Sequence, residues 1–290
     1  MSLTRRTFAL LLAMTPGVGG KSVVRVLARN DLLGRTAEEF LRLSLEAKRE
    51  EYKLSAKSAQ ALAATQPDAV RALEDRLDRL GVSLVTAADA HYPTRVEEMD
   101  PNPPGVLFFY GNAKLVNART FTVLASRGTP PRALEQIEKR VESGVLNAEV
   151  LVSGHDRPEY QRAAVVPLRW GSPRILCLDR GLFQALGESL RDEPFRAARL
   201  WRYQFDPSTD LVVSPFRPEA YYVGVNNQVR DRLIACLSDR LELVHANTGG
   251  NMERNARLAL RAGRPVQVAP ACACAGSLIA EGATELVMED

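Results

Sequence analysis

Four loops of this sequence combine arginine with glycine and hydroxyl residues, rather than with a set of catalytic acids or nucleophiles. They are Ala125-Ser126-Arg127-Gly128, Ser153-Gly154-His155-Asp156-Arg157, Arg230-Asp231-Arg232 and Thr248-Gly249-Gly250-Asn251. Guanidinium groups neutralise phosphates, and small residues let a phosphate chain approach backbone amides. The four loops therefore favour binding of nucleic acid or nucleotide over bond-breaking chemistry.

The elements that must position these loops are strands and helices that alternate from residue 82 onward. We expect strands near 82–85, 106–110, 121–125, 149–153, 175–178, 211–214, 241–245 and 266–269, and helices near 131–143, 158–165, 182–190, 227–237 and 251–262. Such alternation predicts an α/β fold, a doubly wound parallel sheet with helices on both faces. Ligands of such sheets bind beyond the carboxyl ends of the strands. We therefore expect Arg127, Arg157, Arg230 and Arg232 to meet there in one shallow basic trough. Residues 191–207 read as an insertion or long loop.

Residues 1–81 predict a separate, small all-α domain, followed by the α/β domain over 82–290. Thr36 and Glu39 form a capping box, and Pro67 stands at the first position of a further helix. Apolar residues recur at helical spacing after Pro67 until Gly81 ends the run.

A glycine-rich turn, Thr15-Pro16-Gly17-Val18-Gly19-Gly20-Lys21-Ser22, interrupts this helical domain. As a helix-hairpin-helix, Gly17 and Gly19 would let backbone N–H groups approach a DNA phosphate, and Lys21 would add charge. The same hairpin could equally serve only to pack the two helices. A phosphate-binding P-loop is a third interpretation, because Gly20-Lys21-Ser22 fits the end of that motif, although Thr15 replaces its opening glycine.

The composition bounds the class of protein. A net charge of +3 on 290 residues excludes a polybasic coat, so any nucleic-acid site must be a local cluster of arginines. Four cysteines indicate a reduced, cytoplasmic setting, and we expect neither a metal nor a cofactor. Thr4-Arg5-Arg6 and the apolar run after it could be a twin-arginine export signal or the first helix of the hairpin. No apolar run is long enough to predict a membrane span.

Several further motifs, in order along the chain, resemble the DprA/Smf family of DNA-processing proteins. They are His91-Tyr92-Pro93, Pro103-Pro104-Gly105 with the apolar run to Gly111-Asn112, Ser126-Arg127, Leu151-Val152-Ser153-Gly154 with Arg157, Arg230 to Asp239, Gly263-Arg264-Pro265-Val266 and Gly276 to Ala283. The resemblance covers nearly the whole chain, including the helical N-terminal domain, which would be of the SAM-like type. It implies an extended Rossmann-like domain that binds single-stranded DNA, forms a homodimer and helps load a RecA-type recombinase. On this basis we expect no enzymatic activity, and a role in transformation and homologous recombination.

Carried over residue by residue, the resemblance places the DNA-binding loops at Ser126 and Arg127, at Ser153, Gly154 and Arg157, at Arg230 and Arg232, and at Thr248 and Gly249. Tyr221 and Tyr222 could add a stacking face, although core packing is the expectation for at least one of them. The arginines could instead pair with Asp156, Asp231 or Asp239.

The sequence departs from the family in these same loops. Leu124-Ala125 replaces Val-Gly, and Asp156-Arg157-Pro158-Glu159-Tyr160 replaces Ala-Arg-Gly-Ile-Asp. The chain would thus be a diverged member, and we expect no winged-helix domain after Asp290.

Two other functions stay open. One is a nucleotide-binding or nucleoside-monophosphate-hydrolysing enzyme of the phosphoribohydrolase-like superfamily, whose Pro-Gly-Gly-x-Gly-Thr-x-x-Glu signature is partly kept from Thr248 to Glu253. The other is a scaffold that binds only protein partners.

Overall fold

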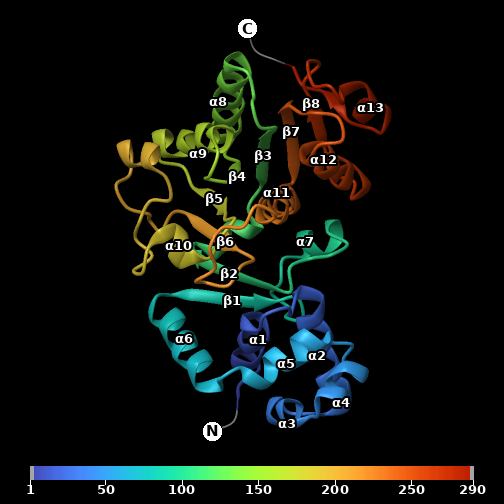
Figure 1. The fold of residues 1–290 in the computed structure, drawn as a ribbon. Helices are drawn as coiled ribbons and strands as arrows, with labels where there is room; N and C mark the ends of the chain where they lie inside the picture. The colour runs from blue at the N-terminus through green and yellow to red at the C-terminus, as the bar shows by residue number, and fades with distance from the viewer. Residues whose placement is uncertain (1–2, 288–290) are drawn as a thin grey trace. The chain divides into compact units, whose positions relative to one another are not determined.

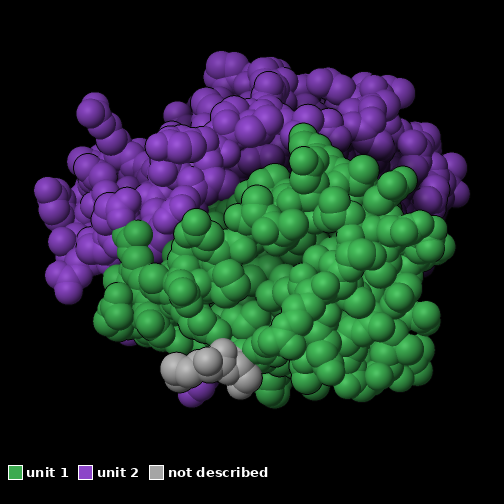
Figure 2. Space-filling model, turned by 60° about the horizontal axis from the view of Figure 1, so that its bottom comes forward, with its two compact units in different colours: residues 1–92, 102–109, 215–217 green, residues 93–101, 110–214, 218–290 purple. Residues whose placement is uncertain are grey.

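The computed structural model describes residues 3–287, which divide into two compact units (Figures 1 and 2). The first unit holds residues 1–92, 102–109 and 215–217, and the second holds 93–101, 110–214 and 218–290. The chain crosses between the two units at 92/93, 101/102, 109/110, 214/215 and 217/218, and the third crossing falls within strand β2. The boundary that we place after Gly81 separates the helices from the first strand, and it stays a prediction.

The first unit is helical up to its two strands. Its elements are α1 (Arg5–Met14), α2 (Gly20–Leu33), α3 (Ala37–Arg42), α4 (Leu45–Glu50), α5 (Ala56–Ala64), α6 (Pro67–Arg79), β1 (Val82–Thr86) and β2 (Val106–Gly111). The capping box predicted at Thr36 is present at the start of α3. Pro67 begins α6, whose Val70, Leu73 and Leu77 are buried, and Gly81 follows with a left-handed φ of 73°.

The second unit is an α/β sheet. Its elements are α7 (Thr94–Met99), the 3-10 helix η1 (Ala113–Asn117), β3 (Thr120–Ala125), α8 (Pro131–Leu146), β4 (Val150–Ser153), α9 (Pro158–Trp170), β5 (Arg174–Cys177), α10 (Leu182–Leu186), the 3-10 helix η2 (Arg196–Leu200), β6 (Leu211–Ser214), α11 (Asn226–Leu237), β7 (Arg240–His245), α12 (Asn251–Arg261), β8 (Val266–Val268), α13 (Ala275–Ala280) and β9 (Thr284–Glu285). The short α7, α13 and β9 were not predicted from the sequence.

The strands of this unit lie in the order β6-β5-β4-β3-β7-β8-β9, and every neighbouring pair is parallel. Strands β3 to β6 are buried along their whole length, as expected where helices cover both faces. Helices α9 and α11 each pack on β3, β4 and β5, and must therefore cover opposite faces (Figure 1). The predicted fold class, a doubly wound Rossmann-like sheet, is confirmed.

The segment predicted as an insertion, 191–207, is ordered. It carries η2, and Asp192 and Gln204 form an antiparallel bridge that closes it at its base. The buried Arg174 guanidinium pairs with the carboxylates of Glu193 at 2.7 Å and Asp210 at 2.9 Å. The insertion is therefore held by ion pairs inside the second unit rather than by a sheet or a long helix.

Candidate nucleic-acid interface

The sheet changes its winding direction between β3 and β7. From β3, the order continues through β4, β5 and β6 on one side and through β7, β8 and β9 on the other. Such a switch point, at the carboxyl ends of the strands, is where open α/β sheets bind ligands. Two of the predicted loops leave the sheet at this point: the loop with Ser126 and Arg127 follows β3, and the loop with Thr248 and Gly249 follows β7.

These two loops are tied together by Ser126. Its backbone N–H donates to the His245 carbonyl at 2.8 Å, and its hydroxyl accepts from the Asn247 N–H at 3.3 Å. Thr129 adds a hydrogen bond from its hydroxyl to the Ser126 carbonyl at 2.7 Å. Ser126 is buried and so acts as a brace between the loops.

Above this brace, Arg127, Gly128, Thr248 and Gly249 are exposed. Within residues 3–287, no carboxylate pairs with Arg127, so its guanidinium is available to an anion. Gly128 and Gly249 have left-handed φ values of 77° and 72°, which explains the choice of glycine in both turns. The backbone N–H of Gly249 is already used, because it donates to the carboxylate of Glu253.

The guanidinium of Arg230 is not available in the same way. Arg230 is fully buried, and its Nε donates to Asp231 at 2.7 Å while its two terminal nitrogens donate to Asp156. One of them also donates to the Asn227 side chain at 3.1 Å. Burial alone would lower the pKa of Arg230, but the Tyr160 hydroxyl and the two acidic partners more than offset this and raise it. The expectation of a free Arg230 in an open trough is wrong, because both acids neutralise it.

Tyr160 holds the centre of this ion-pair cluster. Its ring lies 4.6 Å from the guanidinium carbons of both Arg157 and Arg230, and its hydroxyl donates to Asp231 at 2.6 Å. Arg157 reaches Asp231 at 3.6 Å and is only 12% exposed in its side chain. The cluster of Asp156, Arg157, Tyr160, Arg230 and Asp231 thus carries two positive and two negative charges.

Ser153 and Gly154 lie beneath this cluster. Ser153 is 1% exposed, and a Cβ built on Gly154 would meet the Tyr160 ring at 2.8 Å and Arg230 at 3.0 Å. The glycine therefore makes room for Tyr160 and Arg230. Both residues are enclosed in this arrangement, and the expectation that they let DNA reach backbone amides stays a prediction.

Asp156 is the residue that closes the cluster. Burial alone would raise the pKa of Asp156, but the charge and hydrogen bonds of Arg230 hold it below its usual range. The carboxylate is therefore ionised near neutral pH and occupies guanidinium donors that a phosphate oxygen would otherwise take. The contacts predicted for Arg230 and Arg157 with phosphate stay predictions, and a phosphate that reaches Arg230 must displace Asp156 or lie beside it.

Arg232 lies outside the cluster on the same helix, α11. It pairs with Asp100 at 3.1 Å and keeps a third of its side chain exposed. This partner differs from those considered in the sequence. The four arginines therefore do not form one open trough: Arg127 is exposed and has no carboxylate partner among residues 3–287, Arg232 is half-buried and paired, and Arg157 and Arg230 are enclosed.

The two tyrosines after β6 are more exposed than the sequence led us to expect. Tyr221 and Tyr222 are 74% and 42% exposed, so core packing is wrong for both. The Arg180 guanidinium lies 5.5 Å from the Tyr222 ring and pairs with Asp179 at 2.7 Å. Arg180 follows the carboxyl end of β5, and that position after a predicted strand was the signal that could have identified it.

In the first unit, the glycine-rich turn joins helices α1 and α2, as the hairpin interpretation requires. Residues before the turn are helical, which excludes the P-loop, and Phe8 to Leu12 are buried in the unit. Gly17 has a left-handed φ of 80°, and Gly20 packs against the backbone of Gly105. Gly17, Gly19 and Lys21 are exposed, and their contact with DNA stays a prediction.

Among residues 3–287, no three His, Cys, Asp or Glu side chains are grouped to hold a metal ion. Over the same residues, no helix has the length and apolar character needed to cross a membrane.

Comparison with known proteins assigns the chain to a family. The model of the DNA recombination-mediator protein A family matches residues 83–290, and no curated protein matches the sequence. The fold is similar to DNA processing protein A (DprA) from Streptococcus pneumoniae, with 20% identity, a TM-score of 0.75 and coverage of 99% of this chain and 96% of that one. It is also similar to DNA processing protein A from Helicobacter pylori, described for its single-stranded DNA binding mode, with 17% identity, a TM-score of 0.53 and coverage of 70% and 89%. The chain belongs to the DNA recombination-mediator protein A family.

Proposed function

We propose that this protein binds single-stranded DNA, protects it and passes it to a RecA-type recombinase during DNA uptake and recombination. It acts as a homodimer and without enzymatic activity of its own. The observation that carries the proposal is the pair of braced loops at the β3/β7 switch point, with the exposed guanidinium of Arg127 above them. The family of the chain, and the single-stranded DNA binding mode described for the Helicobacter pylori protein, agree with this chemistry.

The DNA backbone would be held first by Arg127, with the Thr248 hydroxyl and the exposed turn amides beside it. Arg232 supplies a second cation when its ion pair with Asp100 breaks. Tyr222, stacked on Arg180, offers an exposed ring face to a base. Ser126, Ser153 and Gly154 support these contacts from below, and Gly17, Gly19 and Lys21 provide a separate contact in the first unit.

The test is a titration of fluorescent oligothymidylate, followed by anisotropy, at two salt concentrations. Arg127→Glu should weaken binding at least about tenfold, and should lower the slope of log K against log salt by about one. Arg261→Glu, an equally exposed charge reversal at the end of α12, is the matched control and should bind like the wild type. Equal affinity of the two variants would refute the assignment of Arg127.

The nucleotide-hydrolysing alternative needs a carboxylate facing the ligand. Glu253, the acid nearest to the expected position, is 1% exposed, accepts from the Gly249 N–H and pairs with Arg257 at 3.0 Å. These contacts give Glu253 a structural role at the start of α12. We therefore expect no release of a free base from nucleoside monophosphates.

A further inference from the structure

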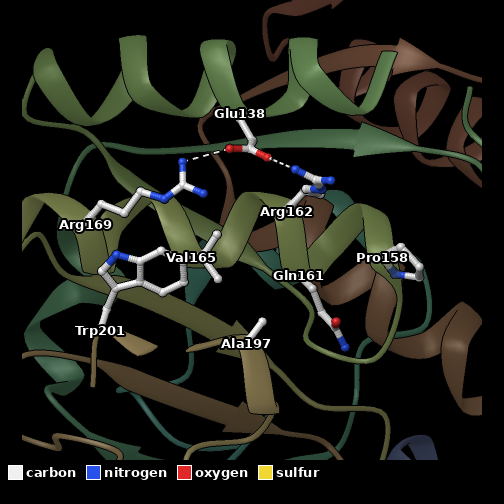
Figure 3. Close-up of a pocket in the computed structure, with 8 residues that line it drawn as sticks. All are labelled: Glu138, Pro158, Gln161, Arg162, Val165, Arg169, Ala197 and Trp201. Atoms are coloured by element: carbon white, nitrogen blue, oxygen red, sulfur yellow. Dashed lines mark hydrogen bonds and ion pairs between the residues drawn. The ribbon is translucent and has the colours of Figure 1, made fainter. Parts of the chain in front are cut away.

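A groove lies along α9, on the side of the second unit where the insertion 191–207 packs. It is lined by Glu138 of α8, by Pro158, Gln161, Arg162, Val165 and Arg169 of α9, and by Ala197 and Trp201 of the insertion (Figure 3). The geometry points to this α9 groove as a second binding segment for single-stranded DNA. The inference rests on the proposed function, because it extends the same strand beyond the switch-point loops.

The groove begins at the candidate interface. Pro158 directly follows Arg157 of the ion-pair cluster, and the Gln161 amide donates to the His155 carbonyl of the same loop at 3.1 Å. Pro158 and Arg169 are eleven residues apart on one helix, which separates them by about 16 Å. A DNA strand that leaves the loop after β4 and passes Pro158 can therefore enter the groove without crossing another helix or strand of the protein.

The far end of the groove has the chemistry of a base-stacking platform. Trp201 is 42% exposed, and the Arg169 guanidinium carbon lies 5.1 Å from its ring. Figure 3 shows Arg169 and Arg162 on either side of Glu138, whose carboxylate accepts from both. Exposed aromatic rings beside guanidiniums recur in proteins that bind single strands regardless of sequence.

Two exposed arginines lie on the insertion that carries this platform, whereas Glu135 and Glu142 of α8 line the adjoining hollow together with Arg162 and Arg169. Arg196 and Arg199 of η2 are exposed, and over residues 3–287 no ion pair holds either of them. Glu193, the buried acid of the insertion, forms an ion pair with Arg174. The phosphates of a DNA strand whose base stacks on Trp201 would thus meet these two guanidiniums. This favours a nucleic acid over an acidic protein segment, because the backbone of such a segment would also have to become ordered.

The platform is also fixed in place. Phe195 and Ala198 of the insertion are buried, and Arg202, next to Trp201, pairs with Asp210 at 2.7 Å. The exposed ring therefore does not need to be ordered when a base stacks on it, which reduces the entropy cost of binding.

The experiment compares oligothymidylates of roughly 4 and 16 nucleotides, a range of site sizes known for single-strand binders. The long oligonucleotide should bind more tightly than the short one and should quench tryptophan fluorescence. Trp201→Ala should weaken the long oligonucleotide by about 5- to 100-fold and leave the short one unchanged. Trp170→Ala is the matched control, because Trp170 is also exposed on α9 but lies outside the groove lining.

Arg196→Glu with Arg199→Glu gives an independent variant on exposed positions, and should also remove the advantage of the long oligonucleotide. Equal affinity for both lengths in the wild type, or an equal loss for both in Trp201→Ala, would overturn the inference and leave the switch-point site standing. Unchanged DNA binding in Trp201→Ala, together with loss of a protein partner, would also overturn it and assign the groove to protein. Absence of binding to either oligonucleotide would overturn the proposed function as well.

Discussion

Replacing Asp156 by Asn should open the ion-pair cluster and tighten binding of single-stranded DNA. Asp156 accepts hydrogen bonds from both terminal nitrogens of Arg230, and its side chain is only 10% exposed. A phosphate that reaches Arg230 must displace this carboxylate or lie beside it. Asn keeps the size of the side chain and removes the negative charge.

The size of the gain follows from the electrostatic repulsion that is removed. A carboxylate and a phosphate charge about 5 Å apart repel by about 1 kcal/mol in a water-like medium and about 3 kcal/mol at an effective dielectric constant of about 20. These energies correspond to about 5- to 150-fold in Kd. Because Asp156 is largely enclosed, we expect a value in the upper half of this range.

The assay is anisotropy with labelled oligothymidylate at low and physiological salt, alongside urea unfolding of the free protein. Arg230 keeps Asp231 and Asn227 as partners, so Asp156→Asn should cost only about 1–3 kcal/mol of the free energy of unfolding. Asp68→Asn removes the same charge from a site that is 94% exposed and should not change affinity. An Asp156→Asn protein that is folded, yet binds DNA no better than the wild type, would refute the view that this carboxylate occupies a phosphate position.

The remaining predictions concern the same unit. Burial lowers the pKa of His155 to about 4, so the unfolded chain takes up the proton first as pH falls. The free energy of unfolding contributed by the neutral imidazole is therefore complete above about pH 6.5 and decreases by about 3 kcal/mol as the pH falls to about 4. Urea unfolding should show this decrease in the wild type but not in His155→Gln. Arg174→Met leaves Glu193 without its buried partner and should cost about 3–5 kcal/mol in urea unfolding, and a loss under about 1 kcal/mol would contradict the anchoring role of this pair. Gly249→Ala places a side chain at a left-handed φ and should cost about 1–2 kcal/mol, whereas an unchanged unfolding curve would contradict that strain.

The sequence predicted the sheet well because its strands are buried on both faces. Short, mainly apolar runs rich in β-branched residues, such as 121–125 and 211–214, favour central strands, and the observed bounds differ by a residue or less. Glycines and capping residues marked the helix ends for similar local reasons, as at Thr36 and Gly81. The short elements α7, α13 and β9 escaped because a single turn of helix or two residues of strand carry no period.

The state of the site residues could not be predicted, because it depends on pairings between distant segments. Arg230 pairs with Asp156, 74 positions away, and Arg232 with Asp100, 132 positions away. The sequence did offer Asp156 and Asp231 as alternative partners of the arginines, and that pairing is confirmed for Arg230, but the residues alone could not decide between it and an open trough. Exposure of Tyr221 and Tyr222 escaped for a related reason, since an aromatic pair after a strand is typical of both core and surface.

Hydrogen exchange of the backbone amides, with and without oligothymidylate, shows where the DNA lies. Binding at the switch point should slow exchange in the loops 126–129 and 247–250, and Arg127→Glu should reduce this protection. Protection confined to other surfaces, with both switch-point loops exchanging as fast as in the free protein, would contradict it.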